Sequence, residues 1–316
     1  MILFIRKLLT TFALIAVVLA GAASLIIGFN FPYQFDQPPT RQDIEAAQRF
    51  YNKAYQAPKN TESQSEYETE YLRVAEWAAA IFNVEGEVRA FVDKFQLKDK
   101  TVLEIGSGRG YLQDIVNDYT GLDISPTVQR FYHKKFVLGS ATAMPFADNT
   151  FDAIWSIWVF EHVPNPEQAF FEARRVTKNG GLLFLWPAWN VPPWLGQGYE
   201  VRPYADFGIL GKITKASIPL RKSMTFRALT ALSVRGTRAA AARFGPTTLR
   251  YQRLTANYEK YWGPDSDAVN SIDVHEAMLW FITRGDECLN CGEAPIFLPV
   301  FHMPLIVRVQ KPGPLS

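Results

Sequence analysis

Several residue types and patterns that identify protein classes are scarce in this sequence. Only two of its 316 residues are cysteine, Cys288 and Cys291, which is too few for a disulfide framework. A single C-x-x-C pair does not predict a zinc or redox site, so we expect two buried or unreacted thiols and no metal. The 33 basic and 31 acidic residues leave a net charge of +2, which gives no indication of nucleic-acid binding. The chain has no internal repeat.

Charge is absent from one long stretch near the amino terminus. Residues 8–28 are 21 consecutive residues without a charged side chain, and as a helix they would span about 32 Å, against about 30 Å for a bilayer core. The small residues 20–22 are also compatible with a cleaved signal peptide, but the apolar run continues through Leu25–Ile27. We therefore predict a retained transmembrane anchor over residues 1–28 and a proline-containing linker over residues 29–40.

The best-defined pattern lies in residues 101–125, TVLEIGSGRGYLQDIVNDYTGLDIS. An apolar run predicts a buried strand at 102–105, followed by a glycine turn, a helix over Tyr111–Val116 and a second strand at 119–124 that contains Asp123. Glycine allows close approach of a ligand, and a carboxylate at the tip of the second strand can bind two ribose hydroxyls. A dinucleotide fingerprint would need glycine where this chain has Tyr111, so a nicotinamide dehydrogenase is disfavoured.

The flanking patterns predict an α/β fold. A capping residue followed by proline starts helices at Ser125 and Asn165, and the second helix is expected to end at Asn179-Gly180. We predict a doubly wound, mostly parallel seven-stranded sheet with an α-helical insertion over residues 189–258, after the fifth strand. Within the insertion, residues 212–253 are basic without an acid, which indicates either an anionic acceptor or membrane surface or a solvated basic face. Further strands are expected at 136–138, 151–159, 182–186, 296–300 and 305–309, and helices at 41–55, 66–95 and 274–283.

The motifs after the glycine turn carry a family resemblance. They are Ala141–Phe146, Asn149–Asp152, Phe160–Val163 and Arg175–Gly181, in this order and at ordinary αβ spacing. Together with the turn they resemble the class I S-adenosylmethionine-dependent methyltransferases, in particular the small-molecule and quinone methylases. The resemblance covers residues 98–187. It implies S-adenosylmethionine as the cofactor and methyl transfer as the activity.

The resemblance also implies roles for individual residues. The glycine turn would contact the methionine half of the cofactor, Glu104 would orient the turn and the cofactor amino group, and Asp123 would hold the ribose hydroxyls. His162 is the candidate base, with packing as the alternative role, and its ordinary pKa near 6.5 suits proton removal. Many relatives have an acid where this chain has Ser140. The expected cofactor-binding residues are Glu104, Gly106, Ser107, Gly108, Gly110, Asp123, Ile124, Ser140, Ala141 and Trp158.

These features predict a membrane-anchored methyltransferase that acts on a small-molecule, lipid-linked or glycan acceptor, with residues 41–316 as its methyltransferase domain. The alternative is a non-catalytic scaffold that binds S-adenosylmethionine. Nucleic acid is not expected as a partner, because Phe160–Val163 stands where an Asn/Asp-Pro-Pro-Tyr/Phe motif would be. The orientation is in conflict: Arg6 and Lys7 place the amino terminus in the cytoplasm and the remainder outside, whereas the cofactor is cytoplasmic. We expect a cytoplasmic catalytic domain on a single amino-terminal span.

Overall fold

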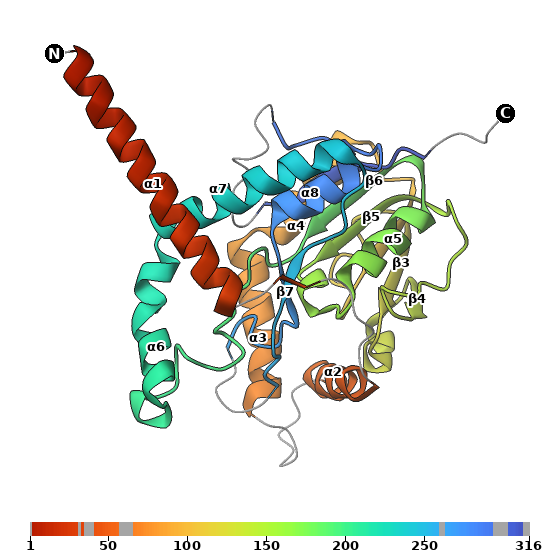
Figure 1. The fold of residues 1–316 in the computed structure, drawn as a ribbon. Helices are drawn as coiled ribbons and strands as arrows, with labels where there is room; N and C mark the ends of the chain where they lie inside the picture. The colour runs from red at the N-terminus through yellow and green to blue at the C-terminus, as the bar shows by residue number, and fades with distance from the viewer. Residues whose placement is uncertain are drawn as a thin grey trace.

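A seven-stranded sheet forms the centre of the molecule in the computed structural model, which describes residues 2–30, 33–34, 41–56, 66–258, 263–292 and 303–311 (Figure 1). The strand order is β4-β3-β2-β5-β6-β10-β9. Neighbouring strands are parallel from β4 to β6, whereas β10 is antiparallel to β6 and β9. This confirms the predicted doubly wound, mostly parallel sheet. The strands are β2 (Thr101–Ile105), β3 (Asp118–Asp123), β4 (Lys135–Leu138), β5 (Phe151–Ile157), β6 (Thr177–Trp186), β9 (Glu287–Cys288) and β10 (Leu305–Arg308).

The central strands are apolar on both sides, and successive side chains enter two separate cores. On one face, Leu103, Ile154 and Leu183 pack in a core with α5 (Pro166–Val176) and α8 (Val274–Ile282). On the other face, their chain neighbours Val102, Ala153 and Leu182 pack in a core with α4 (Val84–Lys94). Layers of helix on both faces bury the sheet and leave the ends of its strands for ligands.

The helices before the first sheet strand are α2 (Arg41–Ala54) and α3 (Glu66–Ile81). The single helix predicted over residues 66–95 is wrong, because Asn83 adopts a left-handed φ of 49° and separates α3 from α4. The expected helix over Tyr111–Val116 is also absent. The chain there forms successive turns, in which the amides of Gln113 and Ile115 donate to carbonyls three residues earlier.

Strand β6 begins earlier than expected. The helix predicted to continue to Asn179-Gly180 ends at Val176, and Thr177 already pairs with Phe151 of β5. The left-handed Gly180 (φ 79°) lies where the β5–β6 register is interrupted, so this glycine serves an irregularity in a strand and not a helix end. The strand predicted at residues 296–300 lies outside the described residues.

A second, three-stranded sheet lies beside the main one in the order β1-β7-β8. Strand β7 (Tyr251–Arg253) is antiparallel to both β1 (Tyr33–Gln34) and β8 (Asn270–Ile272). The expected linker therefore contributes a short strand, and the sheet includes residues beyond the expected end of the insertion at 258. Helices α6 (Ile209–Lys222) and α7 (Met224–Ala241) lie between β6 and β7 in the sequence. Short 3-10 helices occur at η1 (Pro126–Phe131), η2 (Phe160–His162), η3 (Tyr204–Asp206) and η4 (Ala242–Phe244).

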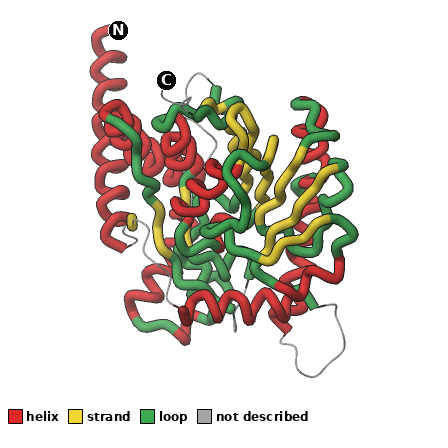
Figure 2. Tube along the Cα trace, turned by 90° about the vertical axis from the view of Figure 1, so that its right-hand side faces the viewer, coloured by secondary structure: helices red, strands yellow, loops and turns green. Residues whose placement is uncertain are grey.

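Helix α1 (Ile2–Asn30) packs against α7. Its amino-terminal end extends away from the sheet domain (Figures 1 and 2). Its segment Phe4–Ala22 is long and apolar enough to cross a membrane, and only 6% of it is buried in the protein. Large side chains such as Phe12, Leu14 and Val17 are more than half exposed. The helix is therefore a candidate membrane span, although a signal sequence would satisfy the same criteria.

The basic stretch of the insertion is partly neutralised within the fold. Arg235 of α7 is buried and donates from Nε to Asp273 at 2.7 Å. One turn later, Arg238 donates from Nε to Glu276 of α8 at 2.7 Å. The side chain of Glu276 is 3% exposed, so this pair lies in the interior. These two arginines hold α7 on α8 and are not part of a solvated basic face.

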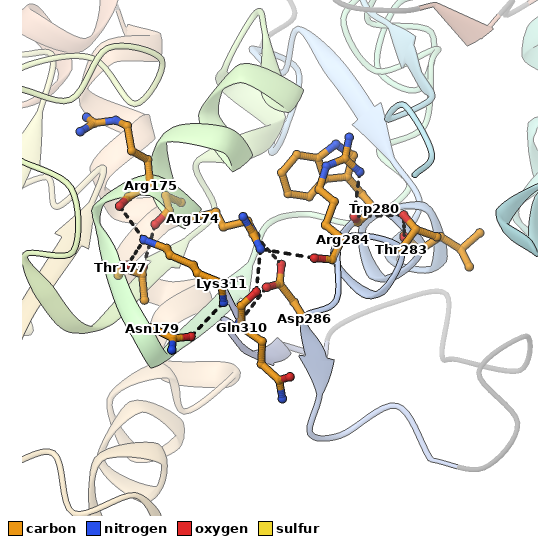
Figure 3. A network of polar contacts seen from close by, with 12 residues as sticks. Arg174, Arg175, Thr177, Asn179, Trp280, Thr283, Arg284, Asp286, Gln310 and Lys311 are labelled. Atoms are coloured by element: carbon orange, nitrogen blue, oxygen red, sulfur yellow. Dashed lines mark hydrogen bonds and ion pairs between the residues drawn. The ribbon is translucent and has the colours of Figure 1, made fainter. Parts of the chain in front are cut away.

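Two sets of bonds hold the segments around β9 and β10. Cys288 and Cys291 form a disulfide, with Cα atoms 5.7 Å apart, so the expectation of two unreacted thiols is wrong. The turn after β9 brings the two residues to this distance. On α5, Arg174 donates to Asp286 at 2.8 Å and to the carbonyl of Gln310 at 2.7 Å (Figure 3).

Candidate active site

The carboxyl ends of the parallel strands surround a cavity of about 350 Å³. Gly106 follows β2, Asp123 and Ile124 lie at the end of β3, Ser140 and Ala141 follow β4, and Trp158 follows β5. This edge is where open α/β sheets bind ligands. Glu104, Ser107, Gly108 and Gly110, which sequence reasoning also selected, are not among the lining residues.

The turn after β2 requires glycine for two separate reasons. Gly106, Gly108 and Gly110 have φ values of 67°, 48° and 69°, in the left-handed region that favours glycine. A Cβ on Gly106 would also lie 2.2 Å from a methyl of Val159. The amides of Gly106 and Ser107 both donate to the carbonyl of Leu122, at 2.8 and 3.1 Å, which fixes the turn against β3.

Asp123 is buried at the tip of β3 and already holds the glycine turn. Its Oδ2 accepts from the amide of Gly108 at 2.9 Å, and its Oδ1 accepts from the amide of Ser125 at 2.8 Å. Burial raises the pKa of Asp123 to about 6, and the backbone hydrogen bonds oppose this shift. Each oxygen retains a further lone pair toward the cavity, so the carboxylate can accept hydrogen bonds from a ligand.

Glu104 lies behind the cavity, inside the sheet. The hydroxyl of Tyr119 donates to its Oε2. Burial raises the pKa of Glu104 to about 8, so this carboxyl is largely neutral at pH 7. Ser140 does line the cavity, but its hydroxyl pairs with that of Thr142 at 2.9 Å.

Tyrosines from the amino-terminal helical segments cover the cavity. Tyr51 of α2, Tyr55 directly after that helix and Tyr71 of α3 line it, and Tyr51 and Tyr55 stack with centroids 6.2 Å apart. Arg109, in the glycine turn, donates to the carbonyl of Tyr55 at 3.0 Å and connects the two parts. The i, i+4 spacing of Tyr51 and Tyr55 was the available signal, but it does not distinguish a ligand lid from core packing.

A second cavity of about 560 Å³ meets the first at Tyr71, Trp158 and His162, which line both. Trp158 has a left-handed φ of 52°, and its amide donates to the carbonyl of Trp186 at 2.8 Å. The walls of the second cavity are mainly apolar and aromatic, with charged groups at a few positions. They include Trp77, Phe82, Trp189 and Leu195, together with Glu200, Lys222, Arg227, Asp265 and Asp267.

His162 lies between the two cavities among carboxyl groups. Its Nδ1 is 3.6 Å from Oδ2 of Asp267, and its Nε2 is 3.8 Å from Oε1 of Glu161. Burial alone would lower the pKa of His162, but Asp267, Glu161 and Asp265 outweigh it and raise the pKa. Burial also raises the pKa of Glu161 to about 7 and that of Asp265 to about 6. This arrangement can accept a proton and stabilise the resulting imidazolium.

Sequence reasoning identified His162 but missed its acidic neighbours. Glu161 was noticed only as part of a motif, and Asp265 and Asp267 lie more than 100 residues further along the chain. No local pattern marks the segment that contains them. They reach the site because Val269, just before β8, donates its amide to the carbonyl of Glu161 at 2.9 Å.

Comparison with known proteins gives consistent matches in the sheet region. A family model described as a methyltransferase domain matches residues 103–185. An uncharacterised methyltransferase of Mycobacterium tuberculosis is 36% identical over 115 residues, which cover 32% of this chain and 44% of that protein. Malonyl-[acyl-carrier protein] O-methyltransferase 1 of Coxiella burnetii is 27% identical over 159 residues, 48% of each chain. These matches span less than half the length of either relative.

Among solved structures, a SAM-dependent methyltransferase from Aquifex aeolicus is similar at 22% identity and a TM-score of 0.29. The aligned part covers 32% of this chain and 64% of that one.

Proposed function

We propose that this chain, a member of the class I S-adenosylmethionine-dependent methyltransferases through residues 103–185, is an active enzyme. It transfers a methyl group to an acceptor held in the second cavity. The contact of the two cavities at Tyr71, Trp158 and His162 carries this proposal. A methyltransferase must place the acceptor in line with the methyl group and away from water. Two cavities that share these three lining residues provide separate, adjacent places for cofactor and acceptor.

The residues around the first cavity fit the family's cofactor, S-adenosylmethionine. Gly106 leaves open a space that a Cβ would fill, and the Asp123 carboxylate has free acceptor positions for ribose hydroxyls. Ile124 and Ala141 offer apolar contacts, and Trp158 and the tyrosine lid close the site. The cofactor supplies an activated methyl group on a sulfonium sulfur. Glu104, Ser107, Gly108 and Gly110 would act indirectly, by shaping the turn.

His162 is positioned to remove a proton from the acceptor. Its ring lies at the junction of the cavities, and the carboxyl groups of Asp267 and Glu161 favour its charged form. A neutral imidazole can take the proton of a hydroxyl or amine as the new bond forms, and Asp267 then stabilises the positive ring. The lid and the aromatic walls exclude water that would compete as acceptor.

Attachment to a membrane is part of the proposal. Helix α1 supports it through its exposed apolar surface, and α6 supports it through a second one. On α6, Ile209, Leu210, Ile213 and Leu220 are 61–80% exposed and fall on one side of the helix at the helical period. Basic residues such as Arg221 follow, as in helices that lie in the head-group region.

The apolar surfaces support attachment to a membrane, and the cytoplasmic face is proposed because the cofactor is cytoplasmic. Residues 1–28 form the anchor, 29–40 the connection, and 41–316 a cytoplasmic methyltransferase domain whose cap includes residues 189–258. An acceptor that is lipid-linked, or otherwise available at the membrane, would suit a site tethered in this way.

The test is methyl transfer by the full chain in detergent, with methyl-labelled S-adenosylmethionine and lipid or glycan extracts of cells that lack the protein. We expect one labelled product, identified by mass spectrometry, that His162→Gln reduces strongly. Arg130→Gln, a surface change on η1, is the matched control. Cofactor binding with no labelled product from any extract would contradict the proposal and favour a non-catalytic scaffold that binds S-adenosylmethionine.

A further inference from the structure

The second cavity has an uneven distribution of charge. Asp265 and Asp267 line it beside His162, and Glu161 lies within 3.8 Å of the same imidazole. Asp265 interacts electrostatically with His162 and Asp267. Glu161 interacts in the same way with His162 and Asp265. One ring that can be positive is thus surrounded by three carboxyl groups, and this end of the cavity is acidic.

The basic groups of the same cavity act on a different acid. Nζ of Lys222 is 2.6 Å from Oε2 of Glu200, and the charge of Arg227 also interacts with Glu200. The other oxygen of Glu200 accepts from the indole of Trp194 at 2.8 Å. These cations form a local group with Glu200, and they do not neutralise the carboxyl groups beside His162.

The acceptor groups of the acidic end lie in two positions, Asp265 on the cavity wall and Glu161 behind it. Oε2 of Glu161 is buried without a hydrogen-bond partner, and the side chain is 1% exposed. Asp265 has a left-handed φ of 60°, a conformation that aspartate and asparagine tolerate better than most residues. Its carboxyl group lines the cavity, with burial and the Asp267 charge both disfavouring its ionised form. A hydrogen-bond donor placed here would be stabilised.

We propose that the acceptor site binds a proton donor, a hydroxyl or an amine that loses its extra proton before the methyl transfer, and that Asp265 rejects a carboxylate at this position. The inference rests on the proposed function, because it names the acceptor class of the same site. A hydroxyl can donate its single proton to either Asp265 or His162, and an amine can donate to both. A carboxylate has no proton to donate and adds a further negative charge beside Asp265 and Asp267, which costs binding energy.

The test compares three small probes of similar size: 2-phenylethanol, 2-phenylethylamine and phenylacetate. Their binding to the full chain in detergent is followed at pH 7.5 by the fluorescence of the cavity tryptophans, with and without S-adenosylhomocysteine. We expect phenylacetate to bind at least about tenfold more weakly than the alcohol and the amine. In Asp265→Asn this difference should shrink severalfold. Asp93→Asn, which removes a charge from the exposed side of α4, should leave it unchanged.

Equal or tighter binding of phenylacetate by the wild-type chain would overturn the proposal. So would failure of both the alcohol and the amine to bind, or the same discrimination in Asp265→Asn as in the wild type. The affinity for S-adenosylhomocysteine, measured separately by calorimetry, checks that the variants are folded. If the wild-type chain does not bind S-adenosylhomocysteine, the proposed function is contradicted. The acceptor class is decided separately, by the relative affinities of the three probes measured without S-adenosylhomocysteine.

Discussion

Oδ2 of Asp267 lies 3.6 Å from Nδ1 of His162 and also accepts a 2.9 Å hydrogen bond from the hydroxyl of Tyr51. Tyr51 belongs to the lid helix α2, and His162 follows β5 of the main sheet. Asp267 precedes β8, in the second sheet. One carboxylate therefore joins the lid, the candidate base and the second sheet at the point where the two cavities meet.

The first prediction concerns the pH dependence of methyl transfer. The base must be neutral to accept a proton, so kcat should rise with pH through the raised pKa of His162. The Asp267 carboxylate favours the imidazolium, so Asp267→Asn should lower this pKa and move the acidic limb of the profile to lower pH. We expect His162→Gln to lower kcat by about 10²-fold or more. The measurement is kcat against pH between 5 and 9.

A control for this prediction exists on the surface. Asp114 forms a 2.8 Å pair with His133, and neither residue lines either of the two cavities, so Asp114→Asn removes a carboxylate from an imidazole outside the site. Its profile should match the wild type. An acidic limb that stays in place in Asp267→Asn would show that His162 is not the titrating base.

The second prediction concerns Asp123 and cofactor affinity. Asp123→Ala removes the ribose acceptor and the bonds to Gly108 and Ser125, so S-adenosylmethionine should bind more weakly by about 1–3 kcal/mol in calorimetry. Asp118→Ala, at the exposed end of the same strand, is the matched control. Equal affinities of Asp123→Ala and the wild type would contradict the assignment.

The raised pKa of Asp123 gives a signed pH effect in the same experiment. Below about pH 6 the carboxyl becomes protonated and loses acceptor capacity, so wild-type affinity should decrease as the pH falls through this value. The stability of the unliganded protein should respond in the opposite direction. A folded pKa above the unfolded one means that ionisation costs stability as the pH rises from about 4 to 6.

Local patterns were sufficient for the strands and for the cofactor edge of the sheet. Val102–Ile105 and Phe151–Ile157 are apolar runs bounded by turn residues, so their burial follows from the sequence. The position of Asp123 after a predicted strand also placed it at the correct edge. The segment Tyr111–Val116 was misread because its apolar spacing fits a helix, whereas six residues are too few to propagate one without tertiary support.

The remainder of the site depends on contacts between distant segments. Asp267 and Tyr51 are separated by 216 residues, and neither lies in a recognisable motif. The basic stretch of α7 was interpreted as a surface because its acidic partners are distant in the sequence. Asp273 and Glu276 each lie 38 residues after the arginine that they pair with. Single-sequence patterns carry no information about such pairings.

The third prediction concerns membrane attachment. Deletion of residues 1–28 should release the chain from carbonate-washed membranes, because the main sheet and both cavities are formed by later residues. The released domain should still bind anionic vesicles through α6. Replacing Ile209, Leu210 and Ile213 together by Gln should weaken that binding about tenfold or more in a vesicle sedimentation assay.

Phe244→Gln is the control for this prediction. Phe244 is 92% exposed but lies on η4, which follows α7, whereas α6 precedes α7. It should bind vesicles like the unmodified domain. A mature chain that lacks its first 20 or so residues would identify α1 as a cleaved signal peptide. Vesicle binding unchanged in the α6 variant would remove that helix from the membrane proposal.

The last prediction separates crowding from backbone strain at the glycine turn. Gly106 and Gly180 have similar left-handed φ values, 67° and 79°, but a Cβ on Gly106 would lie 2.2 Å from Val159 whereas one on Gly180 would have no atom within 4 Å. Gly180→Ala should therefore cost only the strain of about 1–2 kcal/mol in thermal or chemical unfolding. Gly106→Ala should cost more and should also weaken S-adenosylmethionine binding, because the turn must move away from β5. Combining it with Val159→Ala removes both methyls that crowd the new Cβ, so affinity should recover in part. If Gly106→Ala and Gly180→Ala bind the cofactor equally well, close packing at Gly106 does not shape the cofactor cavity.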